Sequence, residues 1–195
     1  MEKKPSSNYI KHTRKDPITK WAIGKFNELL YSYVNKIKPK KILDVGCGEG
    51  FTLKYLTKKG KFSLHGIDSS KEAIRLARKI APKSRLRVGD VTKLPFKGNS
   101  FDIVLLLEIL EHLENPKKII KEVKRLAKKA VIISVPREPY FRIIEVIINP
   151  IIGGLPSGHI NFWNSKKFEK LISEEFKKYE IARTTIWQMA LCYIK

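Results

Sequence analysis

Apolar residues in the segment 17–37 recur at the spacing of an amphipathic helix. Asp16 precedes the segment as a potential N-cap, and Pro17 stands at the first helical position, where the N–H that proline lacks has no partner in the helix. The pattern predicts one long helix before the first apolar strand. Its apolar positions are Trp21, Phe26, Leu29, Leu30, Val34 and Ile37.

From residue 38 onward, short apolar runs alternate with stretches of helical periodicity. Runs that are apolar on both faces are typical of parallel strands covered by helices. Strands and helices that alternate in this way predict an α/β fold with a doubly wound sheet. The expected strands are 41–46, 63–68, 86–91, 101–107 and 130–136, and the expected helices are 51–59, 69–81 with Ser69 or Ser70 as cap, and 116–129.

The regular alternation stops after Pro136. The segment 137–163 is too irregular for another strand–helix unit, and a helix over 166–176 follows, with Asn164 or Ser165 as its cap. The chain continues with two β-rich segments, 179–186 and 188–195. Because only a short break separates these two segments, we expect them to pair antiparallel.

Composition fits a single domain of ordinary size, since 43% of the 195 residues are hydrophobic. We divide the chain into a basic arm with the N-terminal helix (1–37) and one main domain (38–195). The arm has no apolar core and so predicts neither a signal peptide nor a transmembrane segment. Cys47 and Cys192 belong to no paired cysteine motif. We therefore expect a cytoplasmic protein.

Positive charge dominates the sequence, with 40 Lys and Arg against 19 Asp and Glu and a formal net charge of +21. Such a charge attracts nucleic acid, acidic lipid surfaces or an anionic substrate. The densest basic segments are 36–41 and 117–129, and the second has helical periodicity. A solvated, lysine-rich helix face explains this pattern more simply than a dedicated nucleic-acid surface.

A glycine-rich turn, Asp44-Val45-Gly46-Cys47-Gly48-Glu49-Gly50, follows the first predicted strand. Glycines allow a tight turn and the close approach of a ligand to the backbone. A dinucleotide-binding loop would carry another glycine at position 51, which is Phe51, and the phosphate-binding pattern GxxxxGK[ST] is absent. The turn therefore predicts a nucleoside site.

The sequence LDVGCGEG resembles motif I of class I S-adenosylmethionine-dependent methyltransferases, of the methyltransferase type 11 kind. The similarity covers about residues 38–195. It implies a seven-stranded Rossmann-like methyltransferase sheet with an antiparallel last strand, and S-adenosyl-L-methionine as the cofactor. It also implies that Asp68 accepts hydrogen bonds from the ribose hydroxyls and that Asp90 meets the adenine amino group. The full set of implied cofactor-binding residues is Asp44, Gly46, Cys47, Gly48, Asp68, Ser69, Asp90, Val91 and Glu108.

Directly behind the strand 101–107, Glu108, Glu111 and His112 stand at i, i+3 and i+4, and would share one face of a helix that begins there. One hypothesis is that Glu108 lines the methionine pocket while the other two open a helix. The alternative follows from a resemblance to the ubiquinone-biosynthesis O-methyltransferases and the small-RNA 2′-O-methyltransferases. In both groups an ExxEH motif and a later histidine bind a divalent metal. That resemblance implies Glu108, Glu111, His112 and His159 as ligands, for example of Mg or Mn.

The candidate catalytic residues are Glu111, His112 and His159, either with a bound metal or without one. A bound cation lowers the pKa of an acceptor hydroxyl. Without a metal, His112 or His159 could act as the general base.

The segment 137–160 is expected to be a cap-like insertion over the acceptor. Its apolar character suggests a small aromatic, quinone-like or lipidic acceptor, and with the positive surface it suggests peripheral membrane contact. An ordinary packing helix or a homodimer contact explains the same residues. RNA is the second acceptor class considered, and a non-catalytic subunit that binds cofactor and activates a partner methyltransferase is the third hypothesis. The apolar residues concerned are Tyr140, Phe141, Ile143, Ile144, Ile147 and Ile148.

Overall fold

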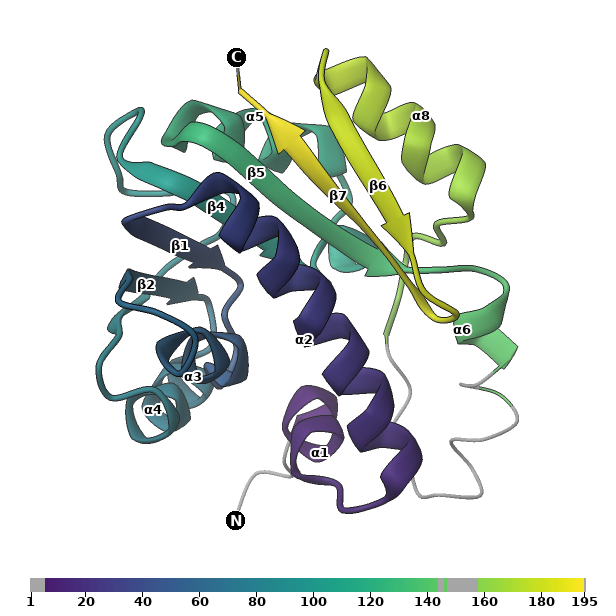
Figure 1. Ribbon diagram of the computed structural model, residues 1–195, viewed down its shortest axis with the longest axis horizontal. Coiled ribbons are helices and arrows are strands. Elements are labelled where there is room, and N and C mark those ends of the chain that lie inside the picture. The colour runs from purple at the N-terminus through teal and green to yellow at the C-terminus, as the bar shows by residue number, and fades with distance from the viewer. Residues whose placement is uncertain (1–5, 144–145, 147–157, 195) are drawn as a thin grey trace.

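A seven-stranded sheet forms the centre of the molecule (Figure 1). The computed structural model describes residues 6–143, 146 and 158–194. The strands are β1 (Lys41–Val45), β2 (Ser63–Asp68), β3 (Arg85–Val88), β4 (Phe101–Leu107), β5 (Ala127–Pro136), β6 (Tyr179–Arg183) and β7 (Trp187–Tyr193). The helices are α1 (Ser7–Thr13), α2 (Pro17–Ile37), α3 (Phe51–Thr57), α4 (Lys71–Ile80), α5 (Pro116–Leu126), α6 (Tyr140–Ile143) and α8 (Ser165–Glu175), with a 3₁₀ turn η1 (Leu110–His112).

The strand order is β3-β2-β1-β4-β5-β7-β6. Strands β1 to β5 are parallel, and β7 runs antiparallel to both β5 and β6. The predicted doubly wound sheet with an antiparallel last strand is confirmed, as is the antiparallel pairing of the two terminal β segments.

Two hydrophobic layers cover the faces of the sheet. Helices α2, α3 and α4 contribute to one layer and helices α5 and α8 to the other. Successive side chains of β4 divide between the layers: Ile103, Leu105 and Leu107 pack with the first, and Val104 and Leu106 pack with the second. This burial on both faces explains why the strand reads as a continuous apolar run.

The register of the parallel strands brings three chain segments to one edge of the sheet. Val45 pairs with both Ile67 and Leu106, so β1, β2 and β4 reach their carboxyl ends together. The residues that follow these strands, which include the glycine turn, Asp68 and Glu108, are therefore neighbours in space. Ligands of open α/β sheets bind at this edge.

Several boundaries differ from the sequence-based expectation. The helix expected over 116–129 ends at Leu126, because Ala127 is fully buried and pairs with Phe101 as the first residue of β5. The N-terminal arm contains helix α1, whose N-cap Ser6 accepts a hydrogen bond from the Tyr9 amide. Residues 144, 147 and 148 of the expected apolar cap lie outside the described residues.

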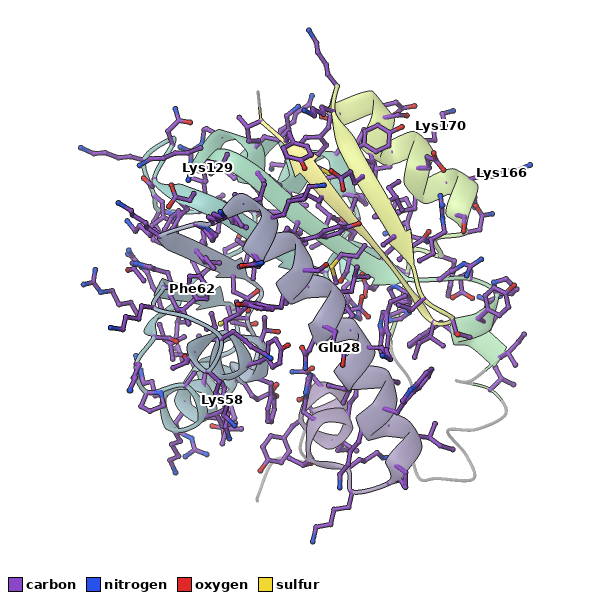
Figure 2. All side chains as sticks on the ribbon, viewed as in Figure 1. Glu28, Lys58, Phe62, Lys129, Lys166 and Lys170 are labelled. Carbon is purple, nitrogen blue, oxygen red and sulfur yellow. The ribbon has the colours of Figure 1, made fainter. Side chains whose placement is uncertain are left out.

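Basic side chains extend from several different elements of the surface. Figure 2 shows Lys58, Lys129, Lys166 and Lys170 pointing outward, and all four are exposed. This distribution favours the interpretation of a solvated charged surface. Among the residues described, no helix combines the length and the apolar character needed to cross a membrane.

Gly24 lies inside α2, where a Cβ atom would meet nothing within 4 Å. We expect Gly24→Ala to raise the free energy of unfolding by roughly 0.5–1 kcal/mol, because alanine loses less backbone entropy in a helix. Urea denaturation would measure this change. Gly50→Ala is the opposite control, since Gly50 has a φ of 80° and its Cβ would lie 3.1 Å from that of Ala77. A loss of stability in Gly24→Ala would contradict the expectation.

Candidate cofactor and catalytic site

The glycine turn after β1 depends on backbone conformations that disfavour other residues. Gly46 has a φ of 72°, and a Cβ on it would lie 2.1 Å from Cδ1 of Ile109. Ile109 directly follows Glu108, so the turn packs against the segment that leaves β4. Cys47 is buried within the turn. The close approach of these two segments places the predicted cofactor turn beside the ExxEH motif.

Asp68 connects the glycine turn to the start of α4. Its Oδ2 accepts a hydrogen bond from the Gly48 amide at 2.8 Å, and its Oδ1 accepts one from the Ser70 amide at 2.8 Å. Ser70 is the N-cap of α4, and Ser69, which lies between Asp68 and Ser70, is exposed. A carboxylate oxygen accepts two hydrogen bonds. Asp68 can therefore hold the turn and accept further hydrogen bonds from ribose hydroxyls.

Asp44, the fourth residue of β1, is only 3% exposed. Its burial, reinforced by the negative charge of Asp68, raises its pKa to about 8. The folded protein therefore holds a proton on this carboxyl group at neutral pH, whereas the unfolded chain releases it.

Replacing Asp44 by asparagine is expected to raise stability by several kcal/mol at pH 8.5. Because the pKa is raised on folding, Asp44 reduces stability increasingly as the pH rises from about 4 to about 8. The gain in Asp44→Asn should thus be much smaller at pH 5. Urea unfolding of the cofactor-free protein at both pH values measures it, and an equal difference at both would contradict the raised pKa.

Asp90 and Val91 follow β3 on the same edge of the sheet. Asp90 is exposed, and its Oδ1 accepts hydrogen bonds from the amide and the hydroxyl of Thr92, both at 2.8 Å. These hydrogen bonds lower the pKa of Asp90. Val91 is partly buried against the core. The pair thus lies at the carboxyl edge of the sheet with the acid held in a turn, and the adenine contact stays a prediction.

The expectation that Glu108, Glu111 and His112 share one helical face is wrong. Glu108 has a φ of 56°, in the left-handed region, and only a single 3₁₀ turn follows at Leu110–His112. The positive φ separates Glu108 from the other two, because a continuous α-helix cannot pass through it.

Glu108 has its own partners. Its Oε2 accepts a hydrogen bond from Nε1 of Trp187 at 2.7 Å, and its Oε1 accepts one from the Ser134 hydroxyl at 3.1 Å. Burial raises the pKa of Glu108, while the charge of Lys11 and these two hydrogen bonds oppose the increase.

The segment that contains His159 is attached to the 3₁₀ turn through the backbone. The amides of Ile160 and Asn161 donate to the carbonyl oxygen of Glu111, at 2.9 and 3.0 Å. This contact places the His159 ring 5.0 Å from the His112 ring, measured between centroids. The structure therefore brings together residues that are 47 positions apart in the sequence, as the ExxEH resemblance implies.

Glu111 is the buried member of this cluster. Its side chain is 1% exposed, and among the described residues neither carboxylate oxygen has a hydrogen-bond partner. Burial and the nearby Glu108 raise its pKa well above the usual range. One donor atom each from Glu111, His112 and His159 lies within 4.8 Å of the others. Glu108 is not part of this group, so the structure gathers three of the four expected ligands.

Helix α1 covers the glycine turn, which sequence reasoning did not anticipate. Nδ2 of Asn8 donates to Oε2 of the buried Glu49 at 2.5 Å, and Ser6 also donates to Glu49. The His12 ring stacks on Phe51 with 4.5 Å between centroids. Burial and the adjacent positive charge of Lys11 lower the pKa of His12 to about 3.

Lys11 extends from α1 toward the acidic residues behind β4. Its Nζ lies 5.8 Å from the centroid of the Trp187 ring. The Trp187 indole is the group that donates to Glu108. Trp187 and Lys11 are thus two residues of the site that the sequence motifs did not reveal. A seven-residue helix and the first residue of a terminal strand carry no recognisable pattern of their own.

Several solved structures share this fold over most of their length. The structure of the PH0226 protein from Pyrococcus horikoshii OT3 matches with a TM-score of 0.75 and 22% identity over 93% of each chain. Magnesium protoporphyrin IX methyltransferase from Synechocystis PCC 6803 with bound SAH matches with a TM-score of 0.70 and 15% identity, over 96% of this chain and 94% of that one. At these identities the likeness concerns the fold.

A sequence profile of the methyltransferase domain family matches residues 43–135. The matched region runs from the first strand to the fifth and includes the glycine turn, Asp68, Asp90 and the ExxEH motif. The profile match, the methyltransferase relatives and the fold together support a class I S-adenosylmethionine-dependent methyltransferase. Its seven-stranded sheet with antiparallel final strands is the fold of this methyltransferase family.

Curated methyltransferases match this chain within the same region at higher identity than these solved structures. Norajmaline N-methyltransferase of Rauvolfia serpentina is 38% identical over 96 residues, which cover 46% of this chain and 33% of that protein. Ubiquinone biosynthesis O-methyltransferase of Coxiella burnetii (strain Dugway 5J108-111) is 34% identical over 96 residues, 47% of this chain and 41% of that protein. The matched region thus spans well under half the length of these relatives.

Proposed function

We propose that this methyltransferase transfers a methyl group from S-adenosyl-L-methionine to a hydroxyl of a small aromatic, quinone-like or lipidic acceptor. The observation that carries the proposal is the Glu111–His112–His159 cluster at the end of β4, beside the glycine turn. The similarity to a ubiquinone biosynthesis O-methyltransferase supports an oxygen acceptor.

The donor set of the cluster fits a divalent cation. One carboxylate and two imidazoles suit several divalent metals, Mn among them. The buried Glu111 oxygens, which have no partner among the described residues, agree with a role as ligands. We propose that Glu111, His112 and His159 hold such an ion, which would lower the pKa of an acceptor hydroxyl.

The residues of the chain can also support the transfer directly. Desolvation lowers the pKa of His112, against an opposing hydrogen bond with the Gly158 backbone. A neutral imidazole can accept the proton of the acceptor hydroxyl. S-adenosylmethionine would supply the sulfonium methyl group, and the acceptor oxygen would bond to that carbon as its bond to sulfur breaks and a neutral thioether leaves. Trp187 and Ser134 fix the Glu108 carboxylate beside this point.

An amine acceptor is the second candidate, because the identity to norajmaline N-methyltransferase, 38% over 96 residues, is higher than the 34% to the O-methyltransferase. A neutral histidine would serve an amine equally well, since it can remove the ammonium proton that blocks the nitrogen lone pair.

Transfer of radiolabelled methyl groups to three acceptors would test the proposal. The acceptors are methyl gallate as a vicinal diol, a secondary amine and a short single-stranded RNA, each with Mn²⁺ and with EDTA. We expect labelled methyl gallate and a large decrease with EDTA. Labelling of the amine or the RNA alone would overturn the proposed acceptor, and full turnover in EDTA would remove the metal.

A further inference from the structure

A groove lies between the first half of α2 and the turn that joins β6 to β7. Its volume is about 190 Å³, and its lining is predominantly apolar. Figure 1 shows this half of α2 and the β6–β7 turn at the same end of the molecule as α1. The lining residues are Trp21, Ala22, Lys25, Thr184, Thr185, Ile186 and Trp187.

Trp187 is the wall that the groove shares with the candidate catalytic site. Its side chain is almost fully buried, and Phe26 packs edge-on against it with 5.3 Å between ring centroids. On the side of the catalytic site, its indole N–H donates to Glu108. The β6–β7 turn is also held in place, because the amide of Arg137 donates to the carbonyl oxygen of Ile186 at 2.9 Å. Trp187 is therefore the single, firmly held side chain that separates the groove from Glu108.

The opposite wall is Trp21, which is 61% exposed. A large aromatic side chain on a groove gains from being covered by an apolar ligand group. Lys25 at the rim pairs with Glu28 at 2.9 Å on the helix surface. With this charge neutralised, the groove suits an uncharged occupant.

The size of the groove limits what it can hold. Pockets that enclose whole drug-sized ligands have volumes of roughly 300 Å³ or more. About 190 Å³ is enough for part of a molecule, such as a short hydrocarbon chain.

We propose that this groove binds the alkyl or isoprenoid tail of the acceptor while the hydroxyl-bearing ring lies at Glu111, His112 and His159. The inference rests on the proposed function and assigns a separate tail-binding site to the same acceptor. Trp21 and Trp187 enclose the chain, and Trp187 determines how far the ring can be from the first carbons of the tail.

Calorimetric binding of methyl gallate and octyl gallate, each to the protein loaded with S-adenosylhomocysteine, tests the groove. The two probes share one ring and differ in the length of the alkyl chain. We expect octyl gallate to bind at least about tenfold more tightly, because part of the added chain is buried. Trp21→Ala should remove most of this difference. Ile18→Ala is the matched control, since Ile18 is 78% exposed on the preceding turn of α2 and does not line the groove.

Equal affinities for the two gallates, no binding of either one, or an unchanged difference in Trp21→Ala would overturn the inference. A dimer that Trp21→Ala dissociates in sedimentation would also overturn it, because a second copy would then occupy the groove. The proposed function is tested separately. Its failure would appear as absent methyl transfer to methyl gallate, whereas failure of the groove would appear as lost chain-length dependence with transfer intact.

Discussion

Replacing Asp68 by alanine is expected to weaken binding of S-adenosylmethionine by at least about 30-fold, or about 2 kcal/mol. The substitution removes an ionised carboxylate that the family resemblance assigns to the two ribose hydroxyls, and hydrogen bonds to charged groups are the stronger ones. The Gly48 amide also loses the acceptor that holds the glycine turn. Isothermal calorimetry with S-adenosylmethionine measures the change. The affinity of Asp68→Asn should lie between those of the wild type and Asp68→Ala, because asparagine retains one acceptor oxygen.

Asp102 provides a matched control for this experiment. Its carboxylate also accepts two backbone hydrogen bonds, from Lys40 at 2.7 Å and Lys41 at 3.0 Å, but at the opposite edge of the sheet. Asp102→Ala should lower stability without changing cofactor affinity. If both variants bound the cofactor as tightly as the wild type, Asp68 would be a structural residue, and the ribose contact that the family resemblance implies would be wrong.

Replacing Glu111 by glutamine is expected to reduce methyl transfer by about 100-fold or more, while the ligand-free protein becomes more stable. Under the proposed metal site the activity would fall because glutamine is a poor metal ligand and cannot carry negative charge. The stability rises because a buried carboxylate without partners among the described residues is removed. Opposite effects on activity and stability are the signature of a residue retained for function.

The stability gain of Glu111→Gln should also depend on pH. Since folding raises the pKa of Glu111, its carboxyl reduces stability above the pKa of the unfolded chain, and the reduction grows as the pH rises. Glu111→Gln should therefore stabilise more at pH 8 than at pH 5 in urea unfolding. Glu114→Gln, three residues later and exposed, is the control for both measurements. Normal turnover in Glu111→Gln would show that the cluster has no catalytic role.

The sheet was predictable because its pattern is local. Ile103 to Leu107 alternate between two buried layers, so every position is apolar and the strand is evident from its own residues. The order of three acids after three strands was equally visible, since parallel strands bring their carboxyl ends to one edge. These features require no knowledge of distant contacts.

The remaining parts of the site depend on contacts between distant segments. The positive φ of Glu108 goes with its burial and with hydrogen bonds to Trp187 and Ser134, which are 79 and 26 residues away. Helix α1 has seven residues, too few to show periodicity, and lies against Glu49 and Phe51. An amphipathic pattern cannot report either arrangement, because the stabilising partners lie elsewhere in the chain.

Alkylation of the two cysteines can report local unfolding of the protein without any added label. Cys47 lies in the glycine turn and Cys192 in β7, both are buried and unpaired, and burial raises the pKa of each thiol. Neither should react with iodoacetamide until its own region opens. Mass spectrometry of the two alkylated peptides would then time the opening of the cofactor edge and of the C-terminal sheet separately. Saturating S-adenosylhomocysteine should slow alkylation of Cys47 well before it affects Cys192.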